Sequence, residues 1–187
     1  RITLRMLLSH SAGLPTAYAP FGYRGEDGLA AYVRDEVSGY EFTAPPGKLY
    51  SYSNPGVRVA GLILQIVAGR PYTELMQELV FDPLDMERTT FDPTVAITYP
   101  VAQSHSLDDD GKLRVRHRYS DNTGPYPSGS VISTAVDMAH YGLMHLNAGA
   151  HRGRRVLAPE SVAEMQRVVA DCYGVGGGGY GLGFHVD

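Results

Sequence analysis

Apolar residues recur along much of this chain at the spacing of one helix face. The pattern predicts helices at residues 3–9, 28–37, 71–80, 133–146 and 159–169. Thr3 is placed as an N-cap of the first, and Ser133 or Thr134 as an N-cap of the fourth. Pro71 and Pro159 stand at helix starts, where proline is tolerated. The chain is therefore predicted to be mainly helical.

The most apolar stretch runs from residue 57 to residue 68. Its only polar residues are Arg58 and Gln65, which lie seven positions apart and so share one narrow stripe of a helix. A helix that is apolar on its other sides is typical of a buried helix. Gly69 follows it as a terminator. We therefore expect a buried central helix, too short to span a bilayer.

Residues 89–129 show no helical period, and a segment this long without regular structure is a candidate functional region. The turn residues 108–111 and the alternating residues 113–117 predict a small β-hairpin within it. Three successive aspartates in this turn do not fit the calcium-loop pattern, because the glycine comes too early and no glutamate closes the loop. Residues 174–179 are predicted to be a glycine-rich linker, and residues 180–186 the start of a strand.

Composition narrows the function further. The 187 residues are 43% hydrophobic and 19% charged, as expected for one globular domain, and the formal net charge is −4. With no basic tract, nothing indicates nucleic-acid binding. The single Cys172 excludes an internal disulfide. His140 and His145 are five positions apart rather than the four of a helical zinc motif. No metal or other cofactor is predicted.

The candidate chemistry lies in residues 46–56, where Pro-Gly pairs flank a short segment rich in aromatic and polar residues. Tyr52 and Asn54 are two positions apart, so in an extended segment the phenol and the carboxamide can face the same side. The following helix offers a rigid base for such a pair. An ordinary loop in an unrelated helical protein remains the alternative, and it predicts that neither side chain faces a cleft.

Several separated stretches then fall into one order. Together they resemble the serine β-lactamase-like family, in the branch of class C β-lactamases, penicillin-binding esterases and D-amino-acid peptidases. The stretches are Ile2–Pro15, Pro46-Gly47 with Tyr50, Tyr52-Ser53-Asn54, Gly61 with Gly69, Pro83–Met86 with Thr89, Gly129 with Ser133–Ala139, and Tyr180–Phe184. Ala12 and Asp85 depart from it, standing where the family often has serine and glycine.

The resemblance implies three catalytic motifs, of which this chain carries one. A serine three positions before a lysine is absent, since Lys48 and Lys112 are preceded at that distance by Pro45 and Asp109. The final lysine- or histidine-x-glycine motif is also missing, because the matching letters at 151–153 fall in a predicted turn between helices. The order of motifs therefore implies that these 187 residues form a single incomplete domain.

The resemblance also assigns an architecture. Residues 1–173 would be mostly the helical subdomain of a β-lactamase/transpeptidase-like α/β fold, with a small hairpin. Residues 174–187 would hold the linker and the first returning sheet strand. An apolar surface left where the sheet belongs is expected to be covered by the rest of its own domain or by self-association.

The same resemblance implies a serine hydrolase that cleaves a small amide or ester substrate through an acyl-enzyme. Tyr52 would act as the base or relay the serine proton, and Asn54 would bind the substrate. A phenol has a pKa of about 10, so acting as a base near pH 7 requires roughly 3–4 kcal/mol of anion stabilisation. His10 is interpreted as bracing the loop before Gly13. The alternative function is a non-catalytic module that binds peptide or cell-wall fragments.

Overall fold

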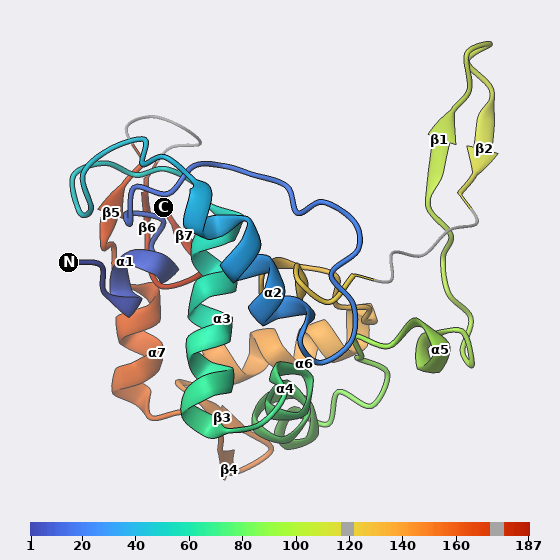
Figure 1. Cartoon of the computed structure of the whole chain (residues 1–187). Coiled ribbons are helices and arrows are strands. Elements are labelled where there is room, and N and C mark those ends of the chain that lie inside the picture. Colours follow the sequence, from blue (N-terminus) through green and yellow to red (C-terminus); the bar gives the residue numbers. More distant parts are fainter. Residues whose placement is uncertain (117–121, 173–177) are drawn as a thin grey trace.

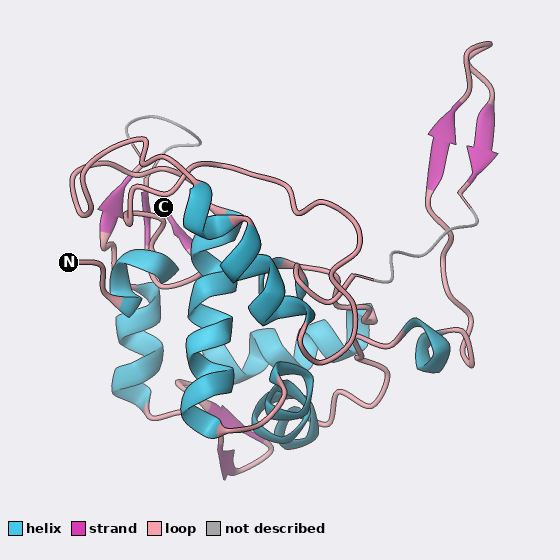
Figure 2. Cartoon of the chain, in the orientation of Figure 1, coloured by secondary structure: helices cyan, strands magenta, loops and turns pink. Residues whose placement is uncertain are grey.

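The computed structural model describes residues 1–116, 122–172 and 178–187. Helices make up most of its regular secondary structure, and the strands are short and peripheral (Figures 1 and 2). The α-helices are α1 (Leu4–Leu8), α2 (Gly28–Asp35), α3 (Asn54–Ala68), α4 (Tyr72–Met76), α5 (Pro93–Ala96), α6 (Ala135–Leu146) and α7 (Pro159–Gln166). The strands are β1 (His105–Leu107), β2 (Leu113–Val115), β3 (Ala150–His151), β4 (Arg154–Arg155), β5 (Ala170–Asp171), β6 (Gly179–Tyr180) and β7 (His185–Val186).

Hydroxyl side chains begin three of the helices. Thr3 accepts a hydrogen bond from the Met6 amide, and Thr134 accepts one from the Asp137 amide. Both N-cap predictions are confirmed. Ser53 caps α3 through the Gly56 amide, so this helix begins at Asn54, three residues before the predicted start. The earlier start moves Asn54 out of the extended segment and onto the first turn of a helix.

Helix α3 is the centre of the helical body (Figure 1). It packs against α1, α2, α4 and the 3₁₀ turn η4 (Tyr126–Ser128). At Gly61 a side chain would collide with Pro127, because a Cβ atom there would lie 2.3 Å from the Pro127 Cγ atom. The glycine therefore allows η4 to lie directly against the helix.

The predicted burial of α3 is wrong in two respects. Arg58 is buried, with its Nη1 atom donating to the Tyr32 hydroxyl at 2.7 Å and its Nε atom donating to the Ser128 hydroxyl at 2.8 Å. Ile66 and Val67, by contrast, are 70% and 81% exposed. Arg58 can enter the interior because α2 and η4 supply two neutral acceptors there. The C-terminal turn of α3 extends beyond these neighbours.

An apolar core lies between α4 and α6. After α4 the chain continues through a π-helical turn η2 (Gln77–Phe81) and a 3₁₀ turn η3 (Asp82–Leu84). Phe81, Leu84, Met86, Phe91 and Met144 pack together there. Asp85 follows with a left-handed backbone (φ 54°), as the resemblance suggested for a position that often holds glycine.

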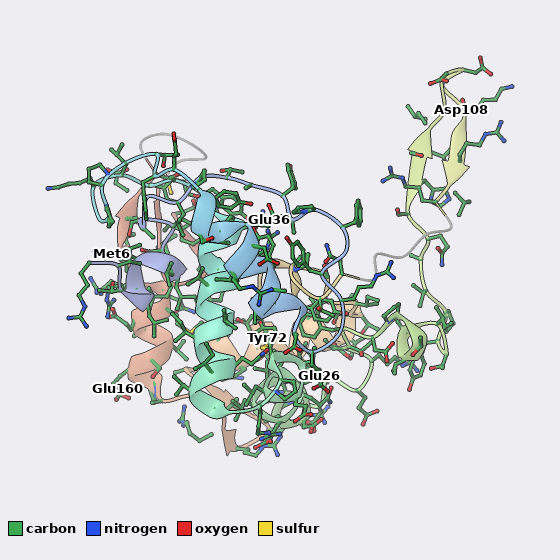
Figure 3. The ribbon with its side chains drawn as sticks, in the orientation of Figure 1. Met6, Glu26, Glu36, Tyr72, Asp108 and Glu160 are labelled. Carbon is green, nitrogen blue, oxygen red and sulfur yellow. The ribbon has the colours of Figure 1, made fainter. Side chains whose placement is uncertain are left out.

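The predicted hairpin is confirmed. β1 and β2 pair antiparallel, with Leu107 opposite Leu113, and project away from the helical body (Figure 1). Asp108 lies near the outer end of this projection, far from Tyr72 at the core (Figure 3). The end of the predicted strand, His117, lies outside the described residues. Helix α5 and turn η4 were not predicted in this segment, which has too few residues per element to show a period.

The chain ends in a three-stranded antiparallel sheet of order β5-β6-β7. Residues 180–186 were predicted as one strand, and this is wrong. Tyr180 ends β6, Gly183 adopts a left-handed backbone (φ 84°), and His185 starts β7. Most of the predicted glycine linker lies outside the described residues. Among the described residues, none of the helices is both long and apolar enough to cross a membrane.

Arg152 and Arg154 are exposed, and both hold the β3–β4 hairpin against the turn that follows η2. Arg152 pairs with Asp85, and Arg154 donates to the carbonyls of Asp82 and Pro83. His151 is buried, with its Nε2 atom 3.1 Å from an Asp85 carboxylate oxygen. The predicted turn between helices is confirmed, and its histidine has a structural partner.

Candidate active site

The Tyr52 segment is held by hydrogen bonds on both sides of the tyrosine. The Ser51 amide donates to the His10 carbonyl at 2.7 Å, and the Ser53 amide donates to the His10 Nδ1 atom at 3.0 Å. The Tyr52 carbonyl accepts from the Thr16 hydroxyl. The backbone of residue 52 is thus fixed, while its side chain remains 45% exposed.

Ser53 contributes structure rather than a nucleophile. Its hydroxyl accepts from the Gly56 amide at 3.1 Å and donates to the Pro15 carbonyl at 3.0 Å. It therefore caps α3 and ties the Tyr52 segment to the loop that follows α1. Ser9 and Ser11 are structural as well, because their hydroxyl groups share a hydrogen bond of 2.9 Å.

Aromatic rings gather around Tyr52. The ring centroid of His10 lies 4.4 Å from that of Tyr52 and 4.7 Å from that of Tyr180, and Tyr180 lies 4.8 Å from His185. Tyr50 joins the same group, at 5.6 Å from Tyr180. We call these five residues the aromatic cluster. It joins the end of α1, the Tyr52 segment and the C-terminal sheet.

Burial is the main cause of the pKa shifts of His10, Tyr50 and Tyr180. Burial lowers the pKa of His10 to about 4 and raises that of Tyr50 to about 12, with Cys172 adding to the Tyr50 shift. Burial also raises the pKa of Tyr180, helped by the nearby Tyr52. His10 is therefore neutral near pH 7, which fits its Nδ1 atom accepting the Ser53 amide proton.

Asn54 lies at the N-terminus of α3 and is half-buried. Within the described ranges, neither the Asn54 carboxamide nor the Tyr52 hydroxyl has a hydrogen-bond partner. The structure brings both residues to the same junction of extended segment and helix. The sequence had suggested that both side chains face one side of an extended segment, but Asn54 belongs to the first turn of α3 instead.

Two cavities in the described part of the chain lie elsewhere. One of about 420 Å³ is bordered by Arg88, Thr90, Tyr99 and Ser133, and one of about 650 Å³ by Phe91, Thr94 and Tyr126. Both are bordered by residues of the 89–129 segment, which was predicted to be a candidate functional region. Tyr52 and Asn54 line neither of them.

His140 and His145 have structural partners. His140 donates through Nδ1 to the Leu84 carbonyl at 3.0 Å, and its ring lies 5.0 Å from that of His151. His145 is buried against Tyr141 and Phe184. Over the residues that the structure describes, no group of three or more His, Cys, Asp or Glu is arranged to hold a metal ion.

The fold and the ordered motifs belong to a known class. The family model described as Beta-lactamase matches residues 1–187, so the chain belongs to the β-lactamase family. The predicted resemblance is confirmed.

Among curated proteins, the chain is 31% identical over 175 residues to penicillin-binding protein 4 of Amycolatopsis lactamdurans, covering 91% of this chain and 45% of that protein. Among solved structures, it resembles the octameric penicillin-binding protein homologue from Pyrococcus abyssi, with a TM-score of 0.74 and 25% identity over 95% of this chain and 42% of that one. The D-amino acid amidase from Ochrobactrum anthropi shares the fold, with a TM-score of 0.74 at 21% identity, covering 96% of this chain and 53% of that one. The chain thus spans about half the length of the relatives that it matches.

Sequence reasoning selected Tyr52 and Asn54 as candidates but missed the contacts of His10. It predicted that His10 braces the loop before Gly13, whereas the His10 Nδ1 atom accepts a hydrogen bond from the amide of Ser53, 43 positions away. Tyr50 and Tyr180 were noted as family positions without a role. The Tyr-x-Tyr pattern at 50–52 could have indicated an aromatic cluster. Its contact with Tyr180 of β6, however, depends on the tertiary structure.

Proposed function

We propose that this chain supplies Tyr52 and Asn54 to the active site of a serine hydrolase. Family membership supports the class of enzyme. The observation that carries the proposal is that the backbone of residues 51–53 makes three hydrogen bonds while Tyr52 is left half-exposed. Fixed placement of an accessible polar group is what a catalytic side chain requires.

The reaction needs groups beyond these residues. A serine hydroxyl would attack the substrate carbonyl while its proton passes to Tyr52, directly or with the help of a lysine. Collapse of the tetrahedral intermediate would release the amine or alcohol, which takes its proton from Tyr52. Water would then hydrolyse the acyl-enzyme. The chain has no serine three positions before a lysine, so we propose that this pair belongs to a part of the protein outside these 187 residues.

Asn54 is proposed to bind the substrate. Its carboxamide offers two N–H donors and one carbonyl acceptor at the start of α3. A carbonyl on the acyl side of the substrate could accept from the N–H group. The substrate class is a small amide or ester, including β-lactams and D-amino-acid peptides.

The test is covalent labelling of the complete protein that contains this chain. Incubation with benzylpenicillin or a fluorophosphonate, followed by intact-mass spectrometry, should show one adduct. Tyr52→Phe should slow its formation. Absence of an adduct on the folded, complete protein would reject the hydrolase. Binding of cell-wall peptides without an adduct would favour the non-catalytic module.

We also propose that the protein self-associates. The Pyrococcus abyssi homologue is an octamer, and this chain exposes Ile66 and Val67 at the end of α3. Light scattering on the complete protein should give a mass above that of the monomer. Ile66→Glu should lower that mass if this surface contributes, and a monomer at all concentrations would reject the proposal.

A further inference from the structure

His10 contacts the Tyr52 segment at three points. Its carbonyl accepts from the residue before Tyr52, its Nδ1 atom accepts from the residue after it, and its ring lies 4.4 Å from the Tyr52 ring at an interplanar angle of 39°. His10 is 3% exposed, so these contacts are shielded from water.

We propose that His10 is a positioning residue that sets the direction of the Tyr52 phenol. This inference rests on the proposed function of Tyr52 as a proton carrier. The Ser53 amide bond to Nδ1 is the main restraint, because it fixes the peptide that leads out of Tyr52. The imidazole ring beside the phenol limits the rotamers that Tyr52 can adopt.

The backbone of His10 supports a specific role. It adopts a left-handed conformation (φ 54°), which is uncommon for a residue with a side chain and is most easily reached by Gly, Asn, Asp and His. This conformation directs the carbonyl and the ring toward the same segment. Glycine would relieve the backbone but would provide neither the ring nor the Nδ1 acceptor.

The protonation state of His10 is part of the restraint. An amide N–H can donate to Nδ1 only while that nitrogen carries no proton, so the ring hydrogen lies on Nε2. The titratable groups around it are Tyr50, Tyr52, Tyr180 and His185, and of these only His185 can become a cation in acid. Protonation of His10 would break the Ser53 bond and release Tyr52.

Two variants separate the bond from the ring. His10→Asn keeps an acceptor oxygen close to the position of Nδ1 and tolerates the left-handed backbone, but it removes the ring. His10→Phe keeps an aromatic ring but removes the acceptor. His105→Asn, on the exposed strand β1, is the matched control for loss of a histidine.

Steady-state hydrolysis of an activated ester by the complete protein gives the first readout. We expect His10→Phe to lower kcat roughly 10- to 100-fold with KM nearly unchanged, because the phenol is misdirected rather than the substrate lost. His10→Asn should recover most of that loss. The opposite order, with Phe more active than Asn, would overturn the proposal, as would equal activity of wild type and His10→Phe.

A second readout does not depend on turnover. NMR of the same proteins, with labelled tyrosine and labelled backbone nitrogen, reports the Tyr52 ring and the Ser53 amide. In wild type both signals should shift together as the pH falls through about 4, whereas in His10→Asn they should not. Signals that do not respond in wild type would reject the positioning role. If they respond while no ester is cleaved, the proposed hydrolase fails and the positioning contact stands.

Discussion

Replacing His10 by asparagine is predicted to change how the stability of the protein depends on pH. The pKa of His10 falls from 6.5 to about 4 on folding, mainly because the ring is buried. The folded state therefore binds this proton more weakly than the unfolded chain does. Its contribution to stability is complete above pH 6.5 and is lost as the pH falls toward 4.

The size of this effect follows from the shift. A depression from 6.5 to about 4 corresponds to about 3 kcal/mol of unfolding free energy. Asparagine does not titrate, so the difference between wild type and His10→Asn isolates the contribution of His10. The shifts of Glu164, Asp92 and Asp108 are present in both proteins and cancel.

Urea unfolding of both proteins between pH 8 and pH 3.5 measures the difference. The two stability curves should run parallel above about pH 7 and then converge or cross as His10 is protonated in the unfolded state. His105→Asn should give no such change, because its side chain lies exposed on β1. Curves that stay parallel from pH 7 to pH 4 would refute the reasoning about His10.

Four further substitutions test the packing. Gly61→Ala should destabilise the protein by about 2 kcal/mol or more, because the new Cβ atom would lie 2.3 Å from the Pro127 Cγ atom. Gly142→Ala is the control: no atom lies within 4 Å of its new Cβ atom, so it should stabilise the protein by about 0.5–1 kcal/mol. Thermal melting measures both changes. Asp137→Ala should cost about 3 kcal/mol in urea unfolding, because its carboxylate accepts three hydrogen bonds, and a loss below about 0.5 kcal/mol would contradict their role. Arg58→Lys should cost about 1–2 kcal/mol by the same assay, since an ammonium cannot reproduce both guanidinium contacts, and an unchanged midpoint would show that neither contact matters.

Local sequence predicted the features that local chemistry determines. The Thr3 and Thr134 caps and the hairpin turn at 108–111 all depend on residues close by in the chain. The family motif likewise placed Tyr52 at a candidate site. These features needed no knowledge of distant partners.

Two of the errors came from long-range contacts. Arg58 was placed on a polar stripe because its acceptors lie 26 and 70 residues away, in α2 and η4. The hydrogen bond between the Ser53 amide and the His10 ring was missed for the same reason, because the two residues are 43 positions apart in the sequence. The error at residues 180–186 was local instead, because Gly183 forms the turn of a hairpin in which Tyr180 pairs with His185.

The acylation rate of Tyr52→Phe tests the central claim most directly. In the complete protein, stopped-flow acylation by nitrocefin or an activated ester should slow by roughly 10²- to 10⁴-fold, as expected for loss of a general acid–base group. Tyr141→Phe is the matched control, because Tyr141 lies in α6, outside both the aromatic cluster and the 89–129 segment. It should acylate at nearly the wild-type rate. Equal acylation by wild type and Tyr52→Phe would contradict the proposed role of this phenol.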